Sequence, residues 1–272
     1  MANQHFKTVT VLTIILAVAL AVVSYCGAFI PATYERDAAS MAAQGMGQDM
    51  VDLFLVVPLL IIFLIWMRRE SKTAFFLFGG TVFYILYSFV IYTFGVHFNR
   101  LFLLYCLILG LSFYIFVLFL HDLNHRDVEN WFGSHVPVRP LGIYMIVIAA
   151  MFYLLWLKDT VPAVLGNTVP ASVSDYGLLV NPVHVIDMAL ALPGLVITAF
   201  LLMKKKKLGY ILTPVLMVFV VILAVALAAM VVMLKIKNIS EDLSIAAIFI
   251  VLALISTAFL YVFLRPMKVL KK

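Results

Sequence analysis

Three polar residues open the otherwise apolar segment NPVHVIDMALALPG, residues 181–194. Asn181, His184 and Asp187 are each three residues apart, so in a helix they share one face. At a rise of about 1.5 Å per residue, Asp187 lies ~9 Å further along that helix than Asn181. An imidazole and a carboxylate at this spacing could bind a metal ion, relay a proton or hold a cationic ligand.

Two further segments bring polar side chains that could join this group. GQDMVD (47–52) contains Gln48, Asp49 and Asp52, and YTFGVHFNR (92–100) contains Tyr92, His97 and Asn99. We expect all nine side chains to surround one ligand pocket. The alternative is a hydrogen-bonded network that is satisfied internally and only fixes the packing of the helices.

A divalent metal is the cofactor that these residue types would suit best. Imidazole and carboxylate groups bind zinc, copper or iron, and the candidate ligands are His184, Asp187 and His97. The spacing matches no established metal-binding motif, so the identity of any cofactor stays open.

The composition places these residues in a membrane protein. Of the 272 residues, 65% are hydrophobic and only 12% are charged, whereas a soluble domain carries about 25% charged residues. The net charge of +6 could indicate a nucleic-acid partner. The basic residues, however, lie between the apolar stretches, where they act as topology signals. The predicted partner is therefore the lipid bilayer and not nucleic acid.

The chain contains eight apolar stretches of a length that can span a bilayer, which takes about 20 residues. They are residues 8–30, 50–67, 73–95, 101–120, 140–157, 182–203, 209–234 and 242–264. Their apolar character is continuous rather than alternating, so the pattern predicts helices and not a barrel. We predict an all-α integral membrane bundle of about eight transmembrane helices, forming a single domain over residues 1–272.

The distribution of basic residues predicts the orientation of the bundle. Alternate connections, together with the two terminal segments, hold 14 of the 19 Lys and Arg residues. The other side has Arg36, Arg100, Lys158, Lys235 and Lys237. The positive-inside rule therefore predicts that both termini are cytoplasmic. An even number of spans agrees with this, because it places the two termini on the same side.

Two connections on the outer side are long, at residues 31–49 and 158–181. The second is rich in Pro, Gly and Ser, and loops of this length are usually functional or disordered. A lid over an outer pocket and a plain connector are both consistent with it. Pro193 and Gly194 predict a kink in the sixth span. No internal repeat is evident.

The segments GQDMVDLFLVVPLL, YSFVIYTFGVHFNRLFLLY and NPVHVIDMALALPG resemble those of a family of uncharacterised polytopic bacterial membrane proteins. The resemblance covers roughly residues 47–235, and the NPVHxxD stretch is its most distinctive part. It implies the fold, a bacterial origin and a location in the cytoplasmic (inner) membrane, but no activity. Its signature residues here are Gln48, Asp49, Asn181, His184 and Asp187.

The leading hypothesis from the sequence is a multi-pass protein with an outward-facing polar pocket that binds or transports a small ligand or cation. One alternative is a membrane-embedded metal or redox protein that uses His and Asp ligands. The other is a structural subunit of a larger membrane complex, with a homo-oligomer or other membrane subunits as partners. Enzymatic activity is not the favoured reading, because no nucleotide-binding or catalytic motif is evident.

Overall fold

The computed structural model describes residues 3–124, 126, 128–132, 136–265 and 267. Within them, eight helical segments are long and apolar enough to cross a membrane, which confirms the predicted all-α bundle. Helices satisfy every backbone polar group internally, as a hydrocarbon environment requires.

The first half consists of α1 (Asn3–Phe29), η1 (Pro31–Tyr34), α2 (Ala39–Val51), η2 (Asp52–Val56), α3 (Val57–Met67), α4 (Lys72–Gly95), α5 (Phe102–Asn124) and η3 (Val128–Trp131). The second half consists of α6 (Val138–Gly166), α7 (Ala171–Ser174), α8 (Pro182–Ile186), η4 (Asp187–Ala191), α9 (Leu192–Met203), α10 (Lys207–Ile236) and α11 (Ser244–Leu264).

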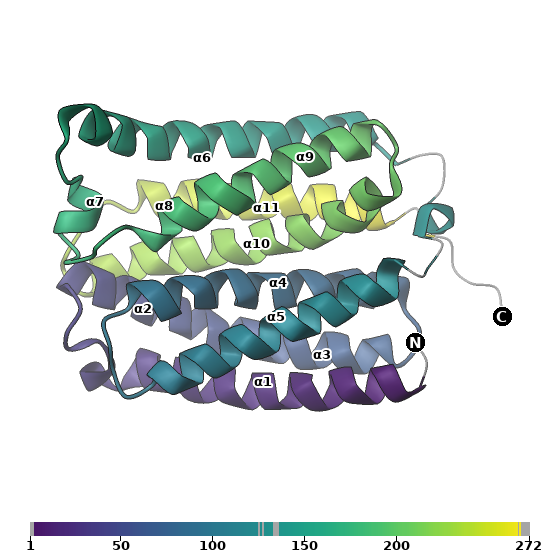
Figure 1. Cartoon of the computed structure of the whole chain (residues 1–272), viewed down its shortest axis with the longest axis horizontal. Coiled ribbons are helices and arrows are strands. Elements are labelled where there is room, and N and C mark those ends of the chain that lie inside the picture. The colour runs from purple at the N-terminus through teal and green to yellow at the C-terminus, as the bar shows by residue number, and fades with distance from the viewer. Residues whose placement is uncertain (1–2, 125, 127, 133–135, 266, 268–272) are drawn as a thin grey trace.

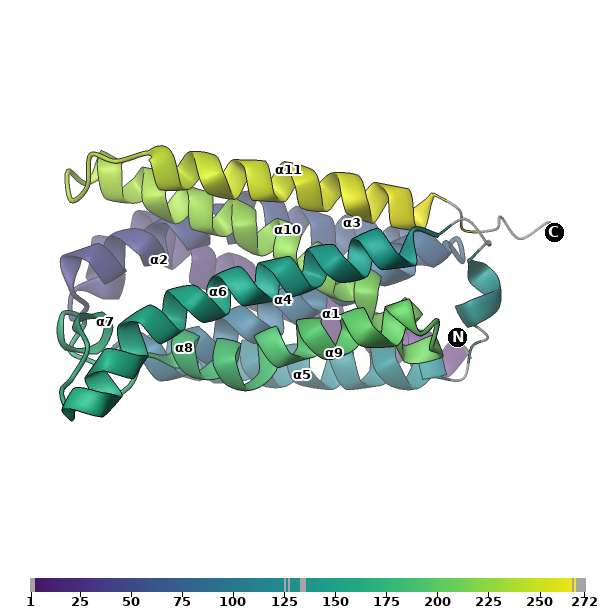
Figure 2. The ribbon, with the colours of Figure 1, turned by 90° about the horizontal axis from the view of Figure 1, so that it is seen from above.

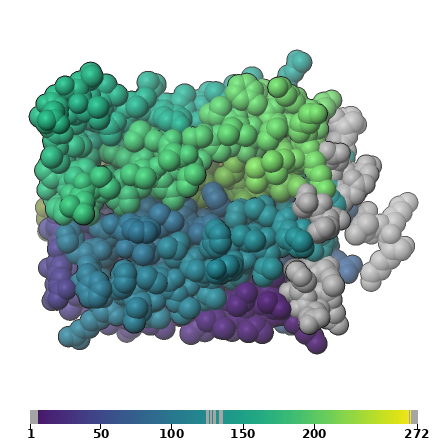
Figure 3. Space-filling model, in the orientation of Figure 1, coloured from purple at the N-terminus to yellow at the C-terminus, as the bar shows by residue number. Residues whose placement is uncertain are grey.

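The two halves have the same order of packing. In the first half, α1 contacts α3, α3 contacts α4 and α4 contacts α5; in the second, α6 contacts α9, α9 contacts α10 and α10 contacts α11. Figure 1 shows the first half, in purple to teal, below the second half, in green to yellow, and Figure 3 shows them as two adjoining bands. Seen from above in Figure 2, α6 crosses obliquely over the bundle.

The second span of each half is interrupted in the same way. The π-helical turns η2 and η4 begin at Asp52 and Asp187, and in each case a proline, Pro58 or Pro193, follows six residues later. Proline has no N–H with which to continue an α-helical hydrogen-bond ladder. The irregularity predicted at Pro193 and Gly194 therefore lies in the turn before them. The correspondence between the halves had not been evident from the sequence.

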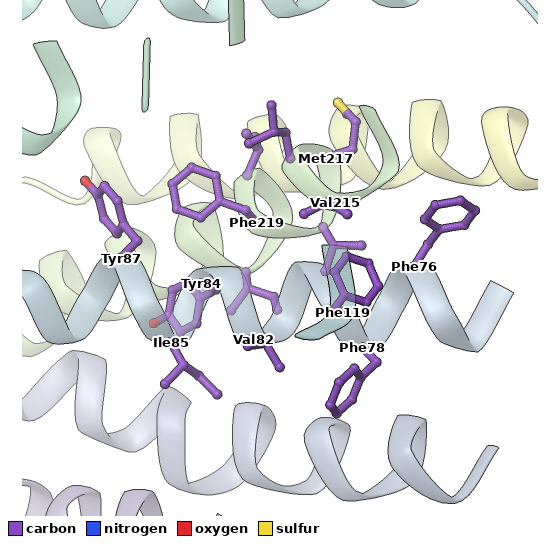
Figure 4. Packing of buried hydrophobic residues seen from close by; sticks show 14 of the residues in the cluster. Phe76, Phe78, Val82, Tyr84, Ile85, Tyr87, Phe119, Val215, Met217 and Phe219 are labelled. Atoms are coloured by element: carbon purple, nitrogen blue, oxygen red, sulfur yellow. The ribbon is translucent and has the colours of Figure 1, made fainter. Parts of the chain in front are cut away.

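The core of the bundle is formed where the third spans of the two halves, α4 and α10, pack together. A Cβ atom added at Gly80 would lie 2.4 Å from the Val218 Cβ atom, so the absence of a side chain there permits the close approach. Figure 4 shows Phe219 and Tyr87 between the two helices, while Ile85 and Phe78 point to the other side of α4. The Tyr87 and Phe219 rings meet edge to face, with centroids 4.9 Å apart.

Two predicted spans are longer in the structure. The second begins at Ala39 rather than at residue 50, because AASMAAQGM is rich in helix-favouring Ala and Met. The fifth continues past residue 157 to Gly166, where Asn167 ends it in the left-handed conformation (φ 49°). The outer connections are shorter than predicted as a result.

The first residues of α1 and the last residues of α11 lie at the same end of the bundle (Figure 1). We call the opposite end, which carries residues 30–38, 96–101, 167–181 and 237–243, the outer end. Its assignment to the outside of the cell remains a prediction from the charge distribution.

Candidate functional site

Asp49 lies fully buried in α2, ten residues after the outer start of that helix at Ala39, and is enclosed by phenols. The Tyr34 hydroxyl donates a short hydrogen bond to its Oδ2 atom, and the Tyr92 hydroxyl donates to its Oδ1 atom at 3.1 Å. Gly27 of α1 faces this carboxylate so closely that a Cβ atom there would lie 1.8 Å from Oδ2. Both oxygens of Asp49 therefore have neutral donors.

Tyr34 belongs to η1, in the connection between the first two spans. Burial, followed by the Coulomb effect of the Asp49 carboxylate, holds the pKa of the Tyr34 phenol well above its usual value. The phenol therefore remains a hydrogen-bond donor to Asp49 at physiological pH.

Asp52 lies one turn further into the bundle and is only 1% exposed. Its Oδ1 atom accepts a hydrogen bond of 2.9 Å from the Tyr84 hydroxyl, and the Gln48 side chain also interacts with this carboxyl group. Among the described residues, its Oδ2 atom has no hydrogen-bond partner. A buried carboxylate oxygen without a donor is unusual and calls for an explanation.

Two buried serine hydroxyls without a partner accompany this oxygen. Ser88 follows Tyr84 by one turn on α4, and its hydroxyl has no hydrogen-bond partner among the described residues. Ser24 precedes Gly27 by one turn on α1. Because α1 and α2 are antiparallel and Gly27 faces Asp49, Ser24 lies at the level of Asp52. The region around Asp52 thus combines three oxygens that lack partners within the described chain.

Asp187 forms a separate group in the second half. Its Oδ1 atom accepts a hydrogen bond of 2.7 Å from the Tyr87 hydroxyl, and its Oδ2 atom accepts one of 2.8 Å from the Trp156 indole N–H. The His184 ring lies against the Trp156 ring, with centroids 4.5 Å apart. Asp187 and His184 are both buried, at 6% and 5% exposed, so neither faces lipid.

Asn181 caps the helix that carries His184. Its side-chain oxygen accepts a hydrogen bond from the Val183 N–H at 3.0 Å, and its amide donates to the Ser172 carbonyl at 3.1 Å. Pro182 occupies the first helical position, where its missing N–H costs nothing. The polar residue at this position is thus explained by helix capping.

His97 and Asn99 lie at the rim of the outer end. The His97 Nδ1 atom lies 2.8 Å from Asp37 Oδ1, and the side chain is one-third exposed. The Asn99 amide donates to the Thr33 carbonyl and to the Tyr105 hydroxyl, both at 3.1 Å. Both residues hold the outer connections in place, and neither hydrogen-bonds to the buried carboxylates.

The nine predicted side chains are therefore distributed over three groups rather than around one pocket. The first is Asp49, Asp52, Gln48 and Tyr92; the second is Asp187, His184 and Asn181; the third is His97 and Asn99. Within the described chain, no three His, Cys, Asp or Glu side chains are placed to hold one metal ion. His97 pairs with Asp37 and not with His184 or Asp187, so the predicted metal ligands do not form a common site.

The connection at residues 167–181 does rest on the other outer segments. The Gln44 amide of α2 donates to the Tyr176 hydroxyl at 3.3 Å. The adjacent Gly177 has a φ of +64°, and a Cβ atom there would lie 3.5 Å from the His97 ring. These contacts join the connection to α2 and to the turn that carries His97, and the lid over an outer pocket stays a prediction.

Four hydrogen-bond partners of the carboxylates were not among the nine sequence candidates: Tyr34, Tyr84, Tyr87 and Trp156. Each lies on a different helical segment from the aspartate to which it donates a hydrogen bond. A tyrosine or tryptophan near a membrane interface is ordinarily explained by the aromatic belt. Sequence spacing alone therefore gives no signal for them.

No protein-family model, curated protein or solved structure matches this chain. The predicted membership in the family with GQD and NPVHxxD motifs therefore stays a prediction. The function must be inferred from the geometry of the three groups.

Proposed function

We propose that this multi-pass membrane protein binds a small monovalent cation, either a proton or an alkali ion, in its outer half and transports it across the membrane. Asp52 is the binding group. The observation that supports this most is the buried Asp52 Oδ2 atom, which lacks a hydrogen-bond donor in the described chain. A bound proton or cation would supply what this oxygen lacks.

The cost of burying a charge gives the physical reason. An ionised carboxylate near the centre of a bilayer costs about 2.5–3.5 kcal/mol on insertion scales. The ion pairs found in the described chain, His97 with Asp37 and Arg126 with Asp122, involve none of the three buried carboxylates. A bound proton or alkali ion would neutralise the carboxylate charge, which no basic side chain among the described residues neutralises.

The surroundings of Asp52 suit a hard cation. Such ions prefer oxygen ligands, and the unpartnered hydroxyls of Ser24 and Ser88 would join the carboxylate. The turn η2 begins at Asp52 itself. Interrupted helices at mid-depth and π turns are both common at the functional sites of membrane transporters.

The Asp187 group favours a structural role. Both of its carboxylate oxygens already accept hydrogen bonds, from two different spans. These bonds join η4 to α4 and to α6, and so tie the two halves together. This supports the alternative in which the NPVHxxD segment fixes the fold, beside a cation site at Asp52.

The test is ion flux in proteoliposomes that contain either a pH-sensitive dye or a dye that responds to Na⁺ or K⁺. With a membrane potential applied, the wild-type protein should change the internal pH, or should change the internal Na⁺ or K⁺ concentration. The first result identifies a proton and the second an alkali ion. Asp52→Asn should abolish the flux, whereas Asp175→Asn, at an exposed outer position, should leave it unchanged. Absence of flux from the wild-type protein with every cation would contradict transport.

A further inference from the structure

A cavity of about 740 Å³ lies at the outer end, between the end of α1, η1 and the turn that precedes α5. Asn99 of the third group lies in its wall, whereas Asp49, Asp52 and Asp187 do not line it. Its apolar rim includes Ile30, Phe98 and Leu103, which are 42%, 67% and 79% exposed. In a membrane, these exposed side chains face lipid.

Charged side chains line the same cavity. Arg36 and Arg100 bring two guanidinium groups, and Glu35 brings one carboxylate. The Arg36 Nη1 atom donates to the Phe98 carbonyl at 2.8 Å, which fixes this side chain across the cavity mouth. Arg36 comes just after the end of the first span and Arg100 just before the start of the fourth. Both therefore lie at the depth of the lipid headgroups.

We propose that this cavity binds a membrane phospholipid whose headgroup carries a phosphate and a primary amine, as in phosphatidylethanolamine. The two guanidinium groups bind the phosphodiester, because the planar donor fork of arginine fits phosphate oxygens. The Glu35 carboxylate accepts from the ammonium group. The acyl chains lie along the apolar rim.

Two features select this ligand over related ones. A free phosphate ion would leave the apolar rim of the cavity without a partner, whereas an acyl chain covers it. A headgroup without an amine, as in phosphatidylglycerol, offers the same phosphodiester to the two arginines but no ammonium group to the Glu35 carboxylate. A quaternary amine has no N–H to donate to Glu35.

The test is native mass spectrometry of the delipidated, detergent-purified protein with added synthetic lipids. Phosphatidylethanolamine should be retained more strongly than phosphatidylcholine or phosphatidylglycerol. The double variant Arg36→Gln and Arg100→Gln should lower its retention about tenfold or more, since the loss of a charge-assisted hydrogen bond is of that order. The matched control is Lys235→Gln with Lys237→Gln, which removes two exposed positive charges from the same end of the bundle. It should have no effect.

A second measurement does not depend on the folding of the variants. A phosphatidylethanolamine with a photoreactive group near the glycerol should crosslink to residues 98–103 of the wild-type protein. Crosslinking distributed evenly over all spans, unchanged retention by the double variant, or tighter retention of phosphatidylglycerol would each overturn the proposal.

Discussion

The buried carboxylates Asp49, Asp52 and Asp187 accept hydrogen bonds from neutral aromatic side chains. Asp49, Asp52 and Asp187 each accept at least one hydrogen bond from a tyrosine hydroxyl. Such donors supply hydrogen bonds without the cost of burying a second charge. Of these three, Asp52 alone keeps an oxygen without a partner among the described residues, which distinguishes the proposed cation site from the groups of Asp49 and Asp187. Asp37 Oδ2 also lacks a partner there, but Asp37 pairs with His97 through its Oδ1 atom.

Removal of the Tyr87 hydroxyl should destabilise the protein. Tyr87→Phe leaves Asp187 Oδ1 without its donor in a buried position, and such a loss costs about 1–3 kcal/mol. The measurement is the free energy of unfolding in mixed detergent micelles. Tyr261→Phe, at a position 63% exposed on α11, is the control and should change little. Equal effects of the two variants would show that the bond to Asp187 contributes nothing.

Alkaline pH should weaken the fold through Tyr34. Its pKa is raised by burial and by Asp49, so the stabilisation is fully present below the unfolded-state pKa of about 10. This stabilisation is lost as the pH rises from that unfolded-state pKa through the pKa of Tyr34 in the folded protein. The unfolding temperature should therefore fall above about pH 10, and less steeply in Tyr34→Phe. Tyr114→Phe, on the exposed side of α5, should retain the wild-type decline.

The sequence predicted which aspartates matter, but not what surrounds them. Asp187 and Asp52 were evident as charges inside apolar stretches, and their burial agrees with that prediction. Trp156 and Tyr34 could not be assigned, because their contacts join spans whose relative rotation sequence spacing does not determine. The same uncertainty led to the prediction of one pocket where three groups exist.

Among the elements, α1 and α2 approach each other closely at Gly27, where a side chain would not fit. Gly27→Ala would place a Cβ atom 1.8 Å from the Asp49 carboxylate oxygen, so the helices must separate or the Tyr34 bond must break. We expect a loss of about 1–3 kcal/mol, as for other overpacked positions. The measurement is again unfolding in detergent.

Gly110→Ala on α5 is the matched control for this prediction. Nothing lies within 4 Å of a Cβ atom there, so the higher helix propensity of alanine should leave stability unchanged or raise it by up to about 1 kcal/mol. Equal free energies of unfolding for Gly27→Ala and Gly110→Ala would contradict the close contact between Gly27 and Asp49.

The positions of the eight spans were largely evident from apolar length, whereas their ends were not. The sixth span matches residues 182–203 as predicted, but the second and fifth extend into the predicted outer loops. The extension of the second span forms helix through its Ala and Met content. The extension of the fifth, residues 158–166, contains Lys158, Asp159 and Pro162, which mark the end of a span in the sequence although the helix continues through them. The π turns cannot be predicted from the periodicity of apolar residues. One added residue in a turn only rotates the side chains that follow it around the helix axis.

In the whole molecule, two similar halves meet where α10 packs against α2 and α4. The interface is crossed by the bond from Tyr87 to Asp187, while the proposed cation site lies within the first half. Two halves that share one packing order and meet at a single interface are the arrangement in which transporters move by rocking.

The orientation predicted for the whole bundle can be tested with fusions at the C-terminus. Fluorescent protein fused after Lys272 should fluoresce in bacterial cells, because the positive-inside rule places this end in the cytoplasm. Alkaline phosphatase at the same position should be inactive. The reverse pattern would invert the topology and with it the side from which the cation enters.

The most direct test of the proposed cation site is infrared difference spectroscopy of the purified protein, with Asp52→Asn and Asp175→Asn for comparison. We predict that the spectrum of wild-type minus Asp52→Asn contains a protonated carboxyl band at neutral pH, or a carboxylate band that shifts when Na⁺ or K⁺ replaces choline. The Asp175→Asn difference spectrum should contain only the band of a hydrated carboxylate that does not respond to the cation. An Asp52 signal that is likewise ionised and insensitive to every cation would contradict the account.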